Sequence, residues 1–139
     1  MNPVVREWIK KAEGDYKASM KLASEDDADI FDAICFHAQQ CAEKYLKAFC
    51  ADNEIRFPRT HNLEELLKIA LRHHTEFEFI RTELEFLNRF SVRVRYPGDF
   101  ASMEETDQSV RATKVVRKFI REKLGPASGG TKPRAKKRK

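Results

Sequence analysis

Apolar residues recur every three or four positions over most of the chain, which is the spacing of helices with one buried face. The first such stripe follows Asn2-Pro3, a cap residue before a proline, and predicts a helix that runs to Ala23. A second stripe, rich in alanine, predicts a longer helix from Asp29 to Ala51.

Two shorter helices are predicted after a polar break at 52–60. Asn62, with Glu65 three positions later, has the sequence of a capping box and predicts a helix that ends near 73–74. The fourth helix is predicted over 76–88. Three phenylalanines widen its apolar surface beyond one stripe, which indicates burial on a second side, against another subunit for example. They are Phe79, Phe86 and Phe90.

The helical spacing fails between Ser91 and Ala101, where valines alternate with arginines. No second strand is available to pair with this segment, so we interpret it as an extended loop. The last helix is predicted to start at Ser102, with Glu105 at the capping-box position, and to stop at Gly125. About five helices without a sheet predict an all-α fold, an antiparallel helical bundle.

Composition supports a single folded unit. A chain of 139 residues has the size of one domain, and its 10 Phe residues supply a large apolar core. With only 5 Gly and 5 Pro, many-turn β folds are excluded. We therefore expect a bundle over residues 1–125 and a separate tail over residues 126–139.

The net charge of +5 belongs to the tail. With its six cations set aside, the 27 Lys and Arg residues no longer outnumber the 22 Asp and Glu residues. The tail is expected to be disordered, and it acts either as an electrostatic arm for nucleic acid or as a solvated end that aids solubility. Its cations are Lys132, Arg134, Lys136, Lys137, Arg138 and Lys139.

Cysteine usage and the chain ends indicate a cytoplasmic protein. Cys35, Cys41 and Cys50 are odd in number and lack paired spacing, so neither a disulfide framework nor a metal site is predicted. We expect no cofactor. The first residues lack the apolar segment of a signal peptide, and no run has the length of a membrane span.

The first candidate site is the loop that contains Arg93, Arg95, Tyr96 and Asp99. Two guanidinium groups suit phosphate, the tyrosine ring can stack on a base, and the carboxylate can orient an arginine. The alternative is a polar connector whose arginines pair with helix carboxylates.

The second candidate is Arg56 with His61, which match the string RxxxxH. A histidine can transfer protons near neutral pH, and an arginine can stabilise a phosphorane charge. The alternative is a histidine at a helix start that bonds the backbone.

The third candidate lies on the second helix. His37, Gln40 and Lys44 share one side, with Glu43 and Lys47 on a neighbouring one, and together they suggest the wall of a polar pocket. The alternative is a histidine that donates to a carbonyl beside a solvated face.

Residues 36–48, FHAQQCAEKYLKA, are the first of three segments with a familiar pattern. They resemble the AQQxAEKxLKA signature helix of the HEPN family (higher eukaryotes and prokaryotes nucleotide-binding domain). His61-Asn62-Leu63 resembles its HNLxxLL element, and Leu87-Asn88 followed by Arg95-Tyr96-Pro97 resembles its LN…RYP element. The segments occur in family order, and the resemblance covers roughly residues 3–124.

The resemblance implies an antiparallel helical bundle, often a homodimer. Many prokaryotic members are encoded beside a small nucleotidyltransferase in toxin–antitoxin arrangements. Some are metal-independent ribonucleases that use an RxxxxH motif near the start of the last helix, and others bind nucleotide or the partner. In this chain Phe100 stands where that histidine would be.

These observations predict a binding module for nucleotide or RNA phosphate that also partners a nucleotidyltransferase. The alternatives are a metal-independent ribonuclease that uses His61 or His37 with an arginine, and a protein-assembly adaptor that binds no nucleotide.

Overall fold

The computed structural model describes residues 1–92 and 96–125, and all regular secondary structure in these residues is helical. This confirms the predicted all-α class. The predicted tail and Arg93–Arg95 lie outside the described residues. The elements in chain order are α1 (Pro3–Ala23), η1 (Ala28–Ile30), α2 (Phe31–Asp52), α3 (Leu63–Leu71), η2 (Thr75–Ile80), α4 (Arg81–Asn88) and α5 (Met103–Leu124).

Three helices, α1, α3 and α5, begin at the predicted cap residues, whereas α2, predicted from Asp29, begins at Phe31 after η1. The Asn2 side chain accepts a hydrogen bond from the Val4 N–H at 2.7 Å, immediately before the proline of α1. At α5 the Ser102 hydroxyl accepts from the Glu105 N–H at 3.0 Å, and the Glu105 carboxylate accepts from the Ser102 N–H at 2.9 Å. Both bonds of that capping box are therefore confirmed.

The segment predicted as a fourth helix over 76–88 divides into two elements. Residues Thr75–Ile80 form the 3₁₀ helix η2, and α4 follows directly. Phe77 and Ile80 are both buried, three residues apart, and a 3₁₀ helix places such residues on one side. Phe77 then packs on Phe49 of α2, with ring centroids 4.6 Å apart.

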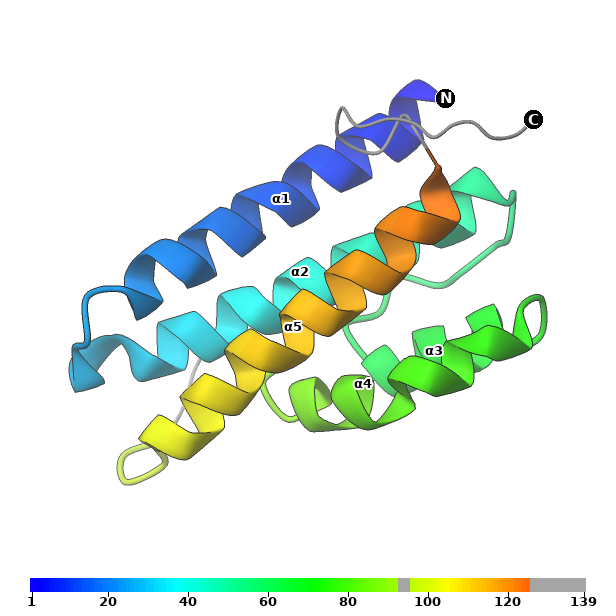
Figure 1. Ribbon diagram of the computed structural model, residues 1–139. Helices are drawn as coiled ribbons and strands as arrows, with labels where there is room; N and C mark the ends of the chain where they lie inside the picture. Colours follow the sequence, from blue (N-terminus) through cyan, green and yellow to red (C-terminus); the bar gives the residue numbers. More distant parts are fainter. Residues whose placement is uncertain (93–95, 126–139) are drawn as a thin grey trace.

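Helix α2 lies at the centre and contacts α1, α3, α4 and α5 (Figure 1). Helix α1 runs antiparallel to α2, whereas α5 runs in the same direction as α2 (Figure 1). Contacts along the pair agree, because Cys35 meets Thr106 near one end and Tyr45 meets Arg121 near the other. The shorter α3 and α4 return the chain to the start of α5.

Side chains from every α-helix meet in one core. Phe86 and Phe90 are buried in it, so the broad apolar face predicted for the fourth helix is largely used within the chain. Phe79 differs, because it is 78% exposed. None of the described helices is both long enough and apolar enough to cross a lipid bilayer.

Candidate functional site

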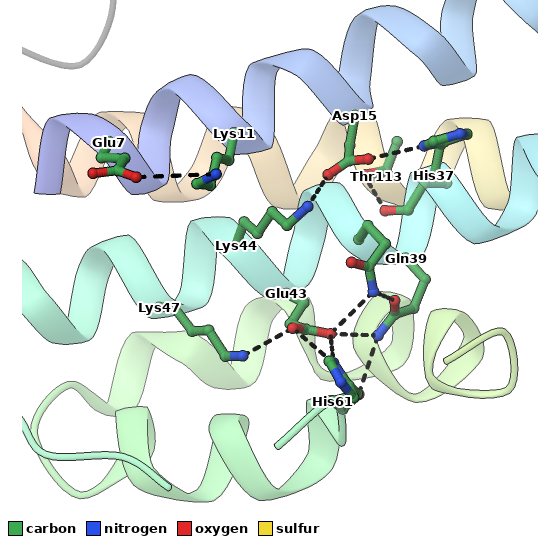
Figure 2. A network of polar contacts seen from close by, with 12 residues as sticks. Glu7, Lys11, Asp15, His37, Gln39, Glu43, Lys44, Lys47, His61 and Thr113 are labelled. Atoms are coloured by element: carbon green, nitrogen blue, oxygen red, sulfur yellow. Dashed lines mark hydrogen bonds and ion pairs between the residues drawn. The ribbon is translucent and has the colours of Figure 1, made fainter. Parts of the chain in front are cut away.

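A buried carboxylate on α2 is the centre of one polar network (Figure 2). The Glu43 side chain is 3% exposed, and Lys47, one turn later, binds its Oε2 at 2.9 Å with a side chain only 8% exposed. Gln39 and Gln40 donate to Oε1 at 3.3 and 3.2 Å. A buried ion pair is maintained only when such hydrogen bonds satisfy its remaining atoms, and here they do.

The same network reaches the surface through His61. Its Nδ1 lies 3.1 Å from each oxygen of Glu43, while its side chain is 70% exposed. The His61 carbonyl accepts a hydrogen bond from Gln39 Nε2 at 3.1 Å. The carboxylate thereby orients the imidazole through Nδ1 (Figure 2), and most of the ring stays exposed to solvent.

A second network joins α1 to α2. Asp15 accepts a hydrogen bond from Lys44 Nζ at 2.5 Å and lies 2.8 Å from His37 Nδ1 (Figure 2). His37 therefore meets a carboxylate rather than the carbonyl of our alternative interpretation. His37 and Lys44 belong to this inter-helix contact, and Gln40 and Glu43 belong to the network of His61. The four predicted pocket-wall residues are thus divided between two clusters.

A third network, which sequence reasoning missed, fixes α5 to α1. Glu13 accepts hydrogen bonds from Arg117 at 2.7 and 2.9 Å and from the Tyr45 hydroxyl. Burial alone would raise the pKa of Glu13, but the hydrogen bonds from Arg117 and Tyr45 and the charge of Arg121 outweigh it and lower that pKa. Glu13 thus remains charged in the folded protein well below neutral pH.

The described part of the predicted loop site is an exposed turn. The Asp99 N–H donates to the Tyr96 carbonyl at 2.9 Å across Pro97-Gly98, and Gly98 has a positive φ of 88° that favours glycine. The Ala101 N–H donates to Asp32 of α2 at 2.8 Å. This bond fixes the loop to the start of α2. Arg93 and Arg95, the predicted phosphate ligands, lie outside the described residues.

Aromatic side chains of this connection face solvent. Tyr96 is 82% exposed and Phe100 is 76% exposed, and the apolar Val92 and Met103 are also exposed. Large apolar side chains gathered on one short surface segment mark a binding surface more often than chance exposure. The sequence analysis predicted Tyr96 as a site residue. It noted Phe100 only because Phe100 occupies the position of the histidine in the RxxxxH motif.

Arg56 and the three cysteines form no catalytic arrangement among the described residues. Arg56 is exposed in the connection between α2 and α3, and no hydrogen bond joins it to His61 in the described part of the chain. Burial raises the pKa of Cys41 to about 12 and that of Cys50 to about 11, and burial also raises the pKa of Cys35. Such thiols stay protonated and are poor nucleophiles.

Two of the motif segments meet at the start of α3. Asn88, the last residue of α4, accepts a hydrogen bond from the Leu63 N–H at 2.7 Å and donates to Asn62 Oδ1 at 3.3 Å. Asn62 in turn accepts from the Glu64 and Glu65 N–H groups at 2.9 and 3.1 Å. The two asparagines thus provide hydrogen-bond acceptors for the N–H groups of the first turn of α3, which have no partner within the helix.

The comparisons with known proteins agree with this fold. A family model described as HEPN domain matches residues 5–124, so the chain belongs to the HEPN family, as the three motif segments predicted. The fold is similar to that in a crystal structure of an archaeal HEPN homologue, with a TM-score of 0.68 and 21% identity. That match covers 86% of this chain and 97% of the other. No protein of curated function matches the chain.

Proposed function

We propose that this HEPN domain is a binding module for nucleotide or RNA phosphate, with its site on the connection between α4 and α5. The observation that carries the proposal is the pair of exposed rings, Tyr96 and Phe100, beside Arg93 and Arg95 in the sequence. Bases stack on aromatic faces, while arginine forks bind phosphate oxygens.

The geometry of the turn favours this role over that of a plain connector. A connector gains nothing from two large rings held in water, since burying each would stabilise the fold by roughly 1.5–3 kcal/mol. The Asp32 bond to Ala101 and the Tyr96–Asp99 turn hold the segment in place. A platform fixed before the ligand arrives loses less entropy on binding.

Single-stranded RNA is the probe for the test. We expect Tyr96→Ala or Phe100→Ala to weaken the affinity for a labelled oligoribonucleotide by about 5- to 150-fold, the range for the loss of one stacked base. Arg95→Ala should weaken it as well and should reduce its dependence on salt. Fluorescence anisotropy at two salt concentrations measures both effects.

Phe79→Ala is the matched control. Phe79 is an equally exposed phenylalanine, but it lies on η2 rather than in the loop. Its replacement should leave the affinity unchanged. An equal loss in Phe79→Ala, or no loss in Tyr96→Ala, Phe100→Ala and Arg95→Ala, would show that the loop is not the site.

The proposal includes a protein partner. Many members of the family are encoded beside a nucleotidyltransferase, and others form homodimers. The exposed apolar side chains of the loop suit contact with a protein surface as well as with a base. If the loop serves only such a partner, the substitutions above would weaken complex formation and leave RNA affinity unchanged.

A metal-independent ribonuclease is the second candidate, because Glu43 holds His61. A carboxylate that accepts from Nδ1 leaves Nε2 as a proton acceptor, the arrangement of a general base. RNA incubated with the protein in EDTA should then be cleaved, and His61→Ala should abolish the cleavage while His73→Ala, another exposed histidine, should not. Intact RNA with the unmodified protein would contradict this candidate.

A further inference from the structure

The starts of α2 and α5 lie at the same end of the bundle, opposite to the end of α5 (Figure 1). Residues near both starts line a hollow of about 120 Å³, and one of its walls is Phe100, an exposed ring. Sites for whole small molecules measure about 300–1,000 Å³, so this hollow has room for a single side chain of a larger partner. Its lining consists of Ala28, Asp29, Phe31, Asp32, Phe100 and Ala101.

The surface around the hollow is strongly acidic. Residues 24–32 and 96–107, which the hydrogen bond from Ala101 to Asp32 joins, hold nine carboxylates and no lysine or arginine. These two segments form what we call the acidic end. The cations next to them in the sequence are Lys21, Arg89, Arg93 and Arg95, so the carboxylates remain in excess.

Most of these carboxylates are available to a partner. Arg89 lies 3.3 Å from Glu105 and offsets that one carboxylate. Five others are exposed and form no ion pair with a lysine or arginine in the part of the chain that the structure describes. They are Glu25, Asp26, Asp29, Glu104 and Asp107.

The hollow suits a long cationic side chain. A lysine or arginine lays its apolar stem along an aromatic ring such as Phe100 and keeps its charge near a carboxylate such as Asp29. The face of the ring also attracts the cation. Because the unpaired carboxylates repel one another, a basic segment bound here would relieve that repulsion.

We propose that the acidic end binds residues 136–139 of the same chain, Lys136-Lys137-Arg138-Lys139. Residues 126–139 hold six cations and no carboxylate, so their charge is complementary to that of the acidic end. A tethered segment also binds at a high effective concentration, which strengthens a contact made of individually weak ion pairs. This contact goes beyond the proposed function and does not depend on RNA binding at the Tyr96 loop.

The chain is long enough for this contact. The 22 residues of α5 span about 33 Å, which is the distance that the segment must return along the bundle. Lys136 is 12 positions after Leu124, and an extended chain of that length spans about 40 Å. Lys132 is 8 positions after Leu124, so its backbone reaches at most about 29 Å. The length therefore selects residues 136–139 among the six cations.

A nitroxide label at position 139 tests the contact in the full-length protein. Lys139→Cys supplies the thiol, and the native thiols are buried, with pKa values raised to about 12 for Cys41 and about 11 for Cys50. The nitroxide broadens the NMR signals of nearby amides, so we expect loss of intensity at Asp29 and Phe100. In roughly 1 M salt, where charges are screened beyond about 3 Å, the intensity should return.

Charge substitutions identify the groups responsible. Asp29→Asn combined with Glu104→Gln should restore most of the lost intensity, because two of the exposed carboxylates are then neutral. Lys136→Glu combined with Lys137→Glu should restore all of it. Glu54→Gln is the matched control, since Glu54 is exposed but follows the other end of α2, and it should leave the broadening unchanged. The amide spectra also show whether each variant keeps its fold.

A mixed sample distinguishes the chain's own segment from that of a second copy. Nitroxide-labelled protein without an NMR isotope is mixed with isotope-labelled protein without nitroxide, and the signals should keep their intensity. Broadening in this mixture would place the segment on another copy and overturn the proposal. Equal broadening over the whole surface, or unchanged broadening in the variant that combines Asp29→Asn with Glu104→Gln, would overturn it as well.

Discussion

Asn88 shows how one side chain can connect two helices. It is the last residue of α4, and its Oδ1 accepts the hydrogen bond of the Leu63 N–H at the start of α3. Leu63 is buried, so water has little access to that N–H if the asparagine is removed. A buried donor without a partner costs more than the bond itself contributes.

Asn88→Ala should therefore lower the free energy of unfolding by about 1–3 kcal/mol. Asn88→Asp keeps an acceptor for the Leu63 N–H and places a negative charge near a helix N-terminus, so it should retain most of the stability. Urea denaturation of both variants measures the difference. If Asn88→Ala and Asn88→Asp lost equal amounts of unfolding free energy, this account would be contradicted. The contribution of Asn88 would then lie in packing or in its bond to Asn62.

The polar networks were only partly predictable from the sequence. Residues three or four positions apart on a helix share a side, so the neighbourhood of Gln40, Glu43 and Lys47 followed from spacing. The contact of Glu43 with His61 did not, because a break with Pro58 separates them and its path depends on tertiary packing. For the same reason Glu13 and Asp15 were missed as partners of residues on α2 and α5.

At the scale of elements, the helices were predictable because local signals agreed. Apolar spacing and cap residues lie within one segment, and the predicted starts at Asn2, Asn62 and Ser102 are the observed caps. The division of 76–88 was not predictable. Its cause is the burial of Phe77 against Phe49, which lies on another helix.

The directions of the helices depend on contacts distant in sequence. Apolar spacing marks a buried face without specifying which helix covers it. The parallel course of α2 and α5 follows from contacts between distant residues. The hydroxyl of Thr113 on α5 donates to the Ala38 carbonyl of α2 at 2.8 Å, between the Cys35–Thr106 and Tyr45–Arg121 contacts. The motif segments were more informative than the spacing, because they indicated a known family fold.

At the scale of the whole molecule, one polar cluster connects all three long helices in addition to the apolar core. Glu13 of α1 meets Arg117 and Arg121 of α5 as well as Tyr45 of α2. The Glu13 contact raises the pKa of Arg117, and the reciprocal effect lowers the pKa of Glu13 below its ordinary value of 4.5. A carboxylate whose pKa is lower in the folded protein stabilises the fold above its unfolded pKa.

Stability should therefore decline as the pH falls from about 4.5 through the folded pKa of Glu13, since protonation removes the contact with α5. Urea midpoints recorded from neutral pH downward measure this decline. Glu13→Gln should be less stable at neutral pH and should lose less on acidification. Glu78→Gln is the control, because the exposed Glu78–Arg81 pair lies within one segment and is screened by water. Parallel curves for Glu13→Gln and the unmodified protein would assign the acid sensitivity to other carboxylates.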